Sequence, residues 1–268
     1  MRGPGAMPNG HETITSRRNP LLRQVRQAAS RRRLTHSGAA LAESPHLLDE
    51  ALRSGIEIER VFASASVATA VAARIPPHRR IRLHVVEDRL FGQVATTSRS
   101  QGVLSLVKLP EAEADAVFAG LTIVLDGIQD PGNAGTIART AEAFGASGLV
   151  FLKGSASPSN PKTLRAAAGS LFRLPTLKGI EPGTFTELAR EHGKTVFAAD
   201  ARGGVPLVEA GISNSAAVVI GSEAHGVAPA ILEGATPIAV PTKSVESLNA
   251  ATAATVIMYE HWRKGLRP

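Results

Sequence analysis

The chain of 268 residues contains no cysteine, which excludes disulfide bonds and thiolate metal ligands. Aromatic residues make up only 4% of it, so recognition of nucleic acid by rows of stacked rings is not expected. No apolar run approaches the roughly 18 residues that a membrane span requires. Met1 to Gly10 lack the apolar core of a signal peptide. These absences suit the reducing cytoplasm, where we expect the protein to act.

Several common catalytic patterns are also missing. The sequence has no H-E-x-x-H and no Cys/His cluster, so we expect no metal. It has no G-x-S-x-G elbow of a serine hydrolase. A G-x-G-x-x-G fingerprint with a downstream ribose-binding acid is not convincingly present, which leaves a nucleotide-dependent oxidoreductase as a distant alternative.

The net charge of +7 is concentrated at one end of the chain. Residues 1–36 contain eight arginines, among them Arg31, Arg32 and Arg33, against the single acid Glu12. The rest of the chain carries equal numbers of basic and acidic side chains. A basic segment on a neutral body favours a polyanion partner, RNA or DNA rather than a membrane. The alternative interpretation is a solvated, poorly ordered tail.

The hydrophobic pattern divides the chain into two α/β units. Residues 1–18 are typical of a disordered lead-in, and strands and helices alternate over a first domain of residues 19–107. The acidic, Ala-rich segment 108–119 is predicted to be a linker. Strands in the second domain, residues 120–266, are more continuously apolar and alternate with helices, which predicts a parallel sheet covered on both faces. Its predicted strands cover 121–125, 148–152, 194–199, 216–220 and 238–240, and its predicted helices cover 136–144, 161–172 and 247–263.

Three polar junctions at strand ends of the second domain are candidates for chemistry, because open α/β sheets bind ligands there. The first, residues 126–141, runs from a strand into a helix whose free amides suit an anion, with Arg139 one turn beyond Gly135. The second, residues 218–226, ends a buried strand in a polar turn containing Glu223. His225 in this turn is a candidate general base, although a surface role is more typical of a lone histidine.

The third junction, residues 240–249, leads into a helix rich in small residues that suits close packing. Ser247 taken alone indicates an N-cap of that helix. Each junction taken alone is better explained as an ordinary strand-to-helix turn with its usual Gly and capping residues.

In this order, the three junctions resemble the motifs of the SpoU (TrmH-like) RNA 2′-O-ribose methyltransferases of the SPOUT superfamily. The first is similar to N-P-G-N-x-G-x-x-x-R-T-A, here opened by Asp130. The second is similar to G-x-E-x-x-G, and the third to a Pro after a strand followed by S-L-N. The first domain, with Arg31 to Arg33, Glu43 and the segment 101–103, resembles the family's substrate-binding domain.

The resemblance implies an α/β fold whose C-terminal parallel sheet carries a deep trefoil knot, beside a smaller N-terminal substrate-binding domain. It implies methyl transfer from S-adenosylmethionine to a ribose 2′-hydroxyl of RNA, and dimerisation through the knot helices. Ribosomal RNA is the expected substrate. A tRNA methyltransferase and a non-catalytic RNA-binding protein of the same fold are the alternatives.

The resemblance also assigns site residues. It implies that backbone groups near Gly221, Val240 and Leu248 hold the cofactor. Arg139 would bind a phosphate and stabilise developing alkoxide charge, because a guanidinium group stays protonated and is a poor base. The remaining residues that the resemblance assigns to catalysis are Asn133 and Glu223, which would fix Arg139, and Ser247 and Asn249, which would order the cofactor loop and the ribose.

Overall fold

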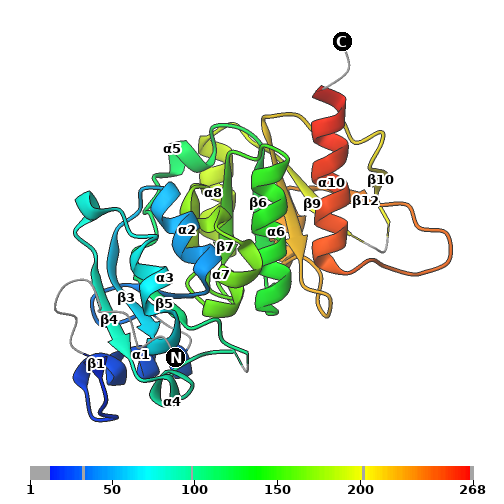
Figure 1. Cartoon of the computed structure of the whole chain (residues 1–268). Coiled ribbons are helices and arrows are strands. Elements are labelled where there is room, and N and C mark those ends of the chain that lie inside the picture. Colours follow the sequence, from blue (N-terminus) through cyan, green and yellow to red (C-terminus); the bar gives the residue numbers. More distant parts are fainter. Residues whose placement is uncertain (1–12, 32–33, 98, 201–202, 266–268) are drawn as a thin grey trace. The chain divides into compact units, whose positions relative to one another are not determined.

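The structure is a computed structural model that describes residues 13–31, 34–97, 99–200 and 203–265. It divides into two compact units (Figure 1). Unit 1 comprises residues 1–109 with 159–161, and unit 2 comprises residues 110–158 with 162–268.

Unit 1 is built on a five-stranded mixed sheet with the strand order β1-β4-β3-β5-β2. The first three strands in that order run parallel, and β5 is antiparallel to both of its neighbours. The strands are β1 (Thr13–Ile14), β2 (Ala40–Glu43), β3 (Ile58–Ser64), β4 (Arg82–Val86) and β5 (Val103–Val107). Strand β1 lies within the predicted lead-in of residues 1–18 and is too short for a periodic signal. It pairs with the end of β4.

The helices of unit 1 cover both faces of its sheet. They are α1 (Pro20–Arg31), α2 (Pro45–Arg53), α3 (Ala68–Ala72) and α4 (Asp88–Phe91), with 3-10 turns at Ala65–Val67 and Pro77–Arg79. Helices α1 and α4 bury Leu22, Val25 and Phe91 against one face of the sheet. The Ser44 hydroxyl caps α2 by accepting the amide of Leu47 at 3.1 Å.

Unit 2 contains a seven-stranded sheet with the order β10-β12-β9-β11-β6-β7-β8, and every pair in it is parallel. The predicted parallel sheet is therefore confirmed. The strands are β6 (Thr122–Asp126), β7 (Gly148–Leu152), β8 (Thr176–Ile180), β9 (Thr195–Ala199), β10 (Val205–Pro206), β11 (Ala216–Gly221) and β12 (Thr236–Ala239). Strands β8 and β10 were not predicted, because both are edge strands with few buried residues.

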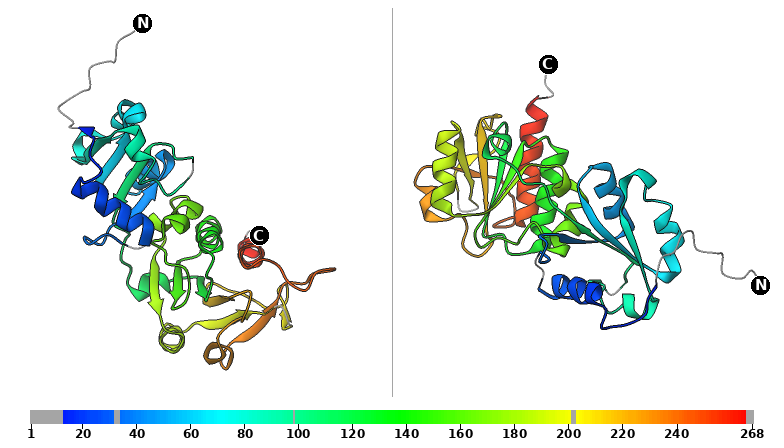
Figure 2. Two further views of the ribbon diagram at one scale, coloured as in Figure 1. Left: turned by 90° about the horizontal axis from the view of Figure 1, so that it is seen from below. Right: turned by 90° about the vertical axis from the view of Figure 1, so that its left-hand side faces the viewer.

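Helices cover both faces of this sheet, as the left view of Figure 2 shows along their axes. They are α5 (Ala114–Val117), α6 (Pro131–Ala143), α7 (Pro161–Ala167), α8 (Pro182–Glu191), α9 (Pro229–Leu232) and α10 (Ala250–Gly265), with a 3-10 turn at Ser170–Phe172. Helices α5, α8 and α9 share one core with Val124, Val150 and Val219, while α6 and α10 pack together over the opposite face. The predicted helix 161–172 is interrupted where Ala168 and Gly169 adopt positive φ.

Because all strands of unit 2 are parallel, the loops that follow β6, β11 and β12 leave the same edge of the sheet. These loops are the three predicted junctions. The fold therefore brings together segments that lie about 90 residues apart in the sequence.

Candidate functional site

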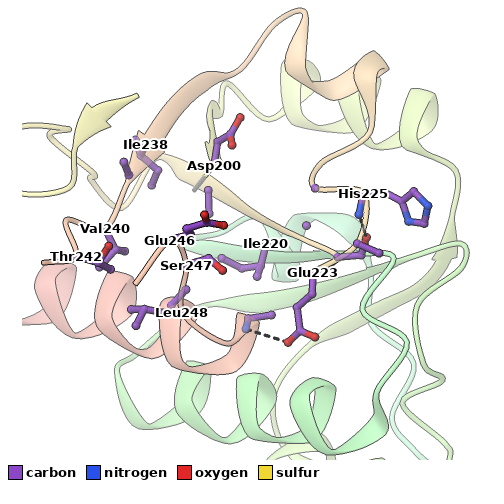
Figure 3. Close-up of a pocket in the computed structure, with 18 of the residues that line it drawn as sticks. Asp200, Ile220, Glu223, His225, Ile238, Val240, Thr242, Glu246, Ser247 and Leu248 are labelled. Carbon is purple, nitrogen blue, oxygen red and sulfur yellow. Dashed lines mark hydrogen bonds between the residues drawn. The ribbon is translucent and has the colours of Figure 1, made fainter. Parts of the chain in front are cut away.

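The three junctions meet in a single hydrogen-bonded cluster. Glu223 Oε1 accepts the side-chain amide of Asn133 at 3.2 Å, the side-chain amide of Asn249 at 3.1 Å and the backbone amide of Ala250 at 3.4 Å. Asn249 Nδ2 also donates to Asn133 Oδ1 at 3.1 Å. In Figure 3 Glu223 points toward the start of α10. The cluster fixes the three loops relative to one another.

The first junction forms a capped helix that packs unusually close to its neighbour. Asp130 is the N-cap of α6, and its carboxylate accepts the backbone amide of Asn133 at 2.7 Å. A Cβ at Gly135 would lie 2.4 Å from the carbonyl oxygen of Thr163 on α7. The Asp-Pro-Gly-Asn-x-Gly pattern therefore encodes both the cap and the helix contact, and it places the side chain of Asn133 at the cluster.

The second junction is a tight turn. Ser222 and Gly226 exchange backbone hydrogen bonds of 3.1 and 2.8 Å, and the amide of His225 donates to Ser222 Oγ at 3.1 Å. A Cβ at Gly221 would lie 2.3 Å from the carbonyl carbon of Gly226. Only glycine fits at position 221, and the closed turn presents the Glu223 side chain to the cluster.

The third junction ends in a cap that differs from the sequence prediction. Helix α10 begins at Ala250, and its N-cap is Asn249, whose Oδ1 accepts the amides of Ala251 at 2.9 Å and Thr252 at 3.3 Å. The interpretation of Ser247 as the N-cap is therefore wrong, because the helix starts three residues later. Asn249 has two roles. Its side-chain oxygen caps α10, and its side-chain amide donates a hydrogen bond to Glu223.

The ends of β11 and β12 and the start of α10 enclose a cavity of about 430 Å³ (Figure 3). Gly221, Val240, Ser247 and Leu248 all line it, so the structure brings the three residues assigned to the cofactor into one hollow. The walls combine aliphatic side chains with backbone groups of the loops. This size and lining are typical of a small-molecule site, which measures roughly 300 to 1,000 Å³.

Apart from His225, the charged side chains among the described residues of this lining are all acidic. Asp200, Glu223 and Glu246 contribute three carboxylates, and no Lys or Arg is among the described residues that line the cavity. Such a lining suits a ligand with positive charge and disfavours one that carries phosphates. Sequence reasoning missed Asp200 and Glu246, although each lies close to the end of a predicted strand.

A smaller hollow of about 170 Å³ adjoins the first. It is lined by residues 127–130 and Asn133, and it shares residues 222–225 and Ala250 with the larger cavity. Glu223 therefore lies where the two hollows meet. A ligand in each would approach the other beside this carboxylate.

Asp126, at the end of β6, ties the first junction to the second. It is buried, and its Oδ2 accepts the amide of Ala228 at 2.6 Å. Burial raises the pKa of this carboxyl above its ordinary value of 3.8, and the hydrogen bond from Ala228 partly opposes that rise.

Arg139 is placed differently from the other assigned residues. Its side chain is exposed on α6, makes no hydrogen bond or ion pair with any residue that the structure describes, and lines neither hollow. Asn133 and Glu223 bind Asn249, and not Arg139 as expected. Of the three arginines assigned to RNA, Arg31 is the last residue of α1, whereas Arg32 and Arg33 lie outside the described residues.

Neither a metal-binding cluster nor a membrane-spanning helix is found in the described part of the chain. No group of His, Asp or Glu side chains there is arranged to hold a metal ion. None of the helices described is both long and apolar enough to cross a bilayer.

The parallel sheet, with a cavity and a polar cluster at the ends of its strands, is typical of an α/β protein that binds a small molecule at that edge. The chain belongs to the SpoU rRNA Methylase family, whose profile matches residues 120–259. Residues 19–105 match the MRM3-like substrate binding domain.

Relatives along the whole chain agree with this assignment. The chain is 31% identical over 250 residues to the 23S rRNA (guanosine(2553)-2′-O)-methyltransferase RlmP of Bacillus subtilis, covering 92% of this chain and 97% of the relative. The AdoMet-bound rRNA methyltransferase of Sinorhizobium meliloti has a TM-score of 0.82 at 25% identity, covering 96% and 99% of the two chains. The SpoU methyltransferase AviRb of Streptomyces viridochromogenes, in complex with AdoMet, has a TM-score of 0.80 at 25% identity, covering 93% and 99%.

Proposed function

We propose that this protein transfers a methyl group from S-adenosylmethionine to the 2′-hydroxyl of one ribose in 23S rRNA, in the cytoplasm. The observation that carries the proposal is the Asn133–Glu223–Asn249 cluster beside an acidic cavity. The name of the Bacillus subtilis relative favours ribosomal RNA over tRNA. A non-catalytic RNA-binding protein would need neither the cluster nor the cavity.

The large cavity fits the cofactor by shape and by charge. When bound, S-adenosylmethionine supplies a methyl group activated by its sulfonium charge. Ile220, Ile238, Val240 and Leu248 would hold the adenine ring, and backbone groups of the loops would bind its edge. The carboxylates of the lining would stabilise the positive end of the ligand. Gly221 allows the turn to close tightly at this wall, because a Cβ there would meet the backbone of Gly226.

The smaller hollow would take the target ribose. Its wall includes Asn133 and Glu223, which would orient the sugar so that the hydroxyl faces the larger cavity. Alignment of the hydroxyl oxygen with the methyl carbon and the sulfur is the main requirement, because the methyl group is already a reactive electrophile. The hydroxyl proton would leave to a water or to the neighbouring phosphate.

Arg139 would act on the RNA and not on the cofactor. Its exposed guanidinium has no partner among the described residues, so it is free to bind the phosphate beside the target ribose. From there it would stabilise the negative charge that develops on the hydroxyl oxygen.

We also propose a trefoil knot and a homodimer. The knot is supported by the path of the last 50 residues: β12 pairs with β9, and α10 then returns to lie against α6 (Figure 1). The dimer is supported by Val256, Tyr259 and Trp262, which expose 37%, 45% and 40% of their surfaces on one side of α10. Trp262→Glu should therefore yield monomers by sedimentation velocity, while Trp262→Phe stays dimeric. A dimeric Glu variant would exclude this face.

The experiment that tests the proposed function uses labelled cofactor. Purified protein is incubated with S-adenosylmethionine carrying a tritiated methyl group and with unmodified 23S rRNA, and the RNA is digested to nucleosides. We expect the label in one 2′-O-methylnucleoside. Label in a methylated base, or in tRNA but not in rRNA, would overturn the proposal.

A further inference from the structure

Unit 1 contains a hollow of its own, of about 710 Å³. It lies where β4 begins, beside β1 and the segment that leads into α1. Arg80, Arg82 and His84 line one side of it, and polar residues including Ser16 and Asn19 line another. All of the described residues that line it belong to unit 1.

The charged side chains among the described residues that line this hollow are all basic. Arg80 and Arg82 are exposed, and neither forms a hydrogen bond or ion pair with another described residue. No Asp or Glu is among the described residues of the lining. A third guanidinium lies close by, because Arg60 pairs with Arg82 in the register of β3 and β4 and its Nη1 is 3.3 Å from His84 Nε2.

Two acids close to Arg60 in the sequence have partners outside the hollow. Glu57 and Glu59 precede Arg60 in the sequence, but they lie 3.1 and 3.8 Å from Lys108 Nζ at the end of β5. Ser37 also donates to Glu59 at 2.9 Å. Neither of these two acids therefore neutralises the arginines of the hollow, and no ion pair to Arg80 or Arg82 is found among the described residues of unit 1.

The opposite wall supplies neutral hydrogen-bonding groups. The backbone amide of Leu21 donates to Asn19 Oδ1 at 2.9 Å, which leaves the side-chain amide of Asn19 as a donor. Hydroxyl groups of Thr13, Thr15 and Ser16 also line the hollow. Charged guanidinium groups opposite neutral donors form a lining suited to phosphate and ribose.

We infer that this hollow binds the ribose-phosphate backbone of the substrate RNA. The inference rests on the proposed function, and it places the RNA contact at Arg80 and Arg82. Guanidinium groups bind phosphate oxygens with paired hydrogen bonds, and contacts of this kind position RNA without reading its sequence. The hollow would therefore set the register of the RNA while unit 2 acts on a single ribose.

The test removes two charges without disturbing the backbone. Arg80 has a φ of +48°, a conformation that asparagine tolerates well, so the variant is Arg80→Asn with Arg82→Gln. The matched control, Arg89→Ala with Arg190→Ala, removes two exposed arginines that line no hollow named here and have no described partner. Binding of unmodified 23S rRNA is measured by filter retention over a range of salt concentrations, and thermal unfolding checks that each variant is folded.

We expect the Arg80/Arg82 variant to bind this RNA about 10-fold or more weakly near physiological salt, with the slope of log affinity against log salt reduced by about 1.5. The Arg89/Arg190 control should retain the wild-type slope. An Arg80/Arg82 variant with wild-type affinity and slope would overturn the inference. Affinity for S-adenosylmethionine and label transfer by the wild-type protein test the proposed function separately.

Discussion

The two units of this protein each contain a hollow of ligand size, and the linings differ in the sign of their charge. In unit 2 three carboxylates line the cavity, whereas in unit 1 two arginines and a histidine line it. Each described lining also includes one histidine, His225 in unit 2 and His84 in unit 1, but no Lys or Arg lines the first and no Asp or Glu lines the second among the described residues. The difference matches the chemistry of the two substrates, since S-adenosylmethionine carries a sulfonium cation and RNA is a polyanion. Net charge alone, +7 for the chain, conceals this division.

Arg139 lies in unit 2, but we propose that it binds the RNA and not the cofactor. Its substitution should have the largest effect among the variants that test this comparison. We expect Arg139→Ala to lower kcat by about 1,000-fold, because it removes charge stabilisation that is needed only in the transition state. Affinity for S-adenosylmethionine, measured by calorimetry, should stay within about twofold, since Arg139 does not line the cavity. A fully active variant would exclude the proposed role.

Gly221→Val tests whether the acidic cavity is the cofactor site. The new Cβ would meet the backbone of Gly226 at 2.3 Å, so the turn must move and the cavity wall with it. We expect S-adenosylmethionine to bind about 100-fold more weakly or not at all, while RNA affinity falls by much less, because the proposed contacts with the RNA backbone lie in unit 1. Equal loss of both affinities would mean that the two hollows do not act independently.

Glu246→Gln tests whether the negative charge of the cavity contributes to cofactor binding, because it removes one charge with little change in the shape of the side chain. The wild-type protein should prefer S-adenosylmethionine over S-adenosylhomocysteine, which lacks the sulfonium charge. We expect this preference to fall by about 3-fold in the Gln variant, a modest change because Glu246 is exposed. Competition calorimetry with both ligands measures the ratio of the two affinities. An unchanged ratio would show that Glu246 does not contribute to binding of the sulfonium charge.

The smallest expected effect concerns Asp126 and the pH dependence of stability. Burial raises the pKa of this carboxyl in the folded state above 3.8, so the folded protein retains a proton that the unfolded chain has lost. Its contribution to the free energy of unfolding therefore falls as pH rises from 3.8 through the raised pKa, and is constant above it. Asp126→Asn retains an acceptor for the Ala228 amide and removes the titration.

Chemical denaturation of the wild-type protein and this Asn variant across that range measures the difference in free energy of unfolding. We expect the wild type to lose stability relative to the variant as pH rises. A difference that does not vary with pH would show that Asp126 does not titrate there.

Much of unit 2 could be predicted from the sequence because its signals are local. Apolar strands such as 216–220 and turns such as 221–226 have short, characteristic patterns, and the parallel sheet then brings their ends together. The cluster of Asn133, Glu223 and Asn249 follows from that topology. The helix cap at Asn249 was missed because Ser247 is an equally good capping residue, and only the path of the loop distinguishes the two.

The hollow of unit 1 was not predicted, for a physical reason. Charge counted over long stretches detects the excess in residues 1–36, whereas the short basic run of Arg79, Arg80 and Arg82 lies in a body with equal numbers of acidic and basic side chains. Arg60 joins this run only through the pairing of β3 with β4. The exposure of Arg139 could not be predicted from the sequence either. The motif places Arg139 on a helix but does not show which face of that helix it occupies.

The central claim is that the acidic cavity of unit 2 binds the cofactor while the basic hollow of unit 1 binds the RNA backbone, and steady-state kinetics of the Arg80→Asn/Arg82→Gln variant test it most directly. We predict that KM for 23S rRNA rises by about 10-fold while KM for S-adenosylmethionine and kcat at saturating RNA stay near the wild-type values. A rise in both KM values, or a change in kcat alone, would contradict the account.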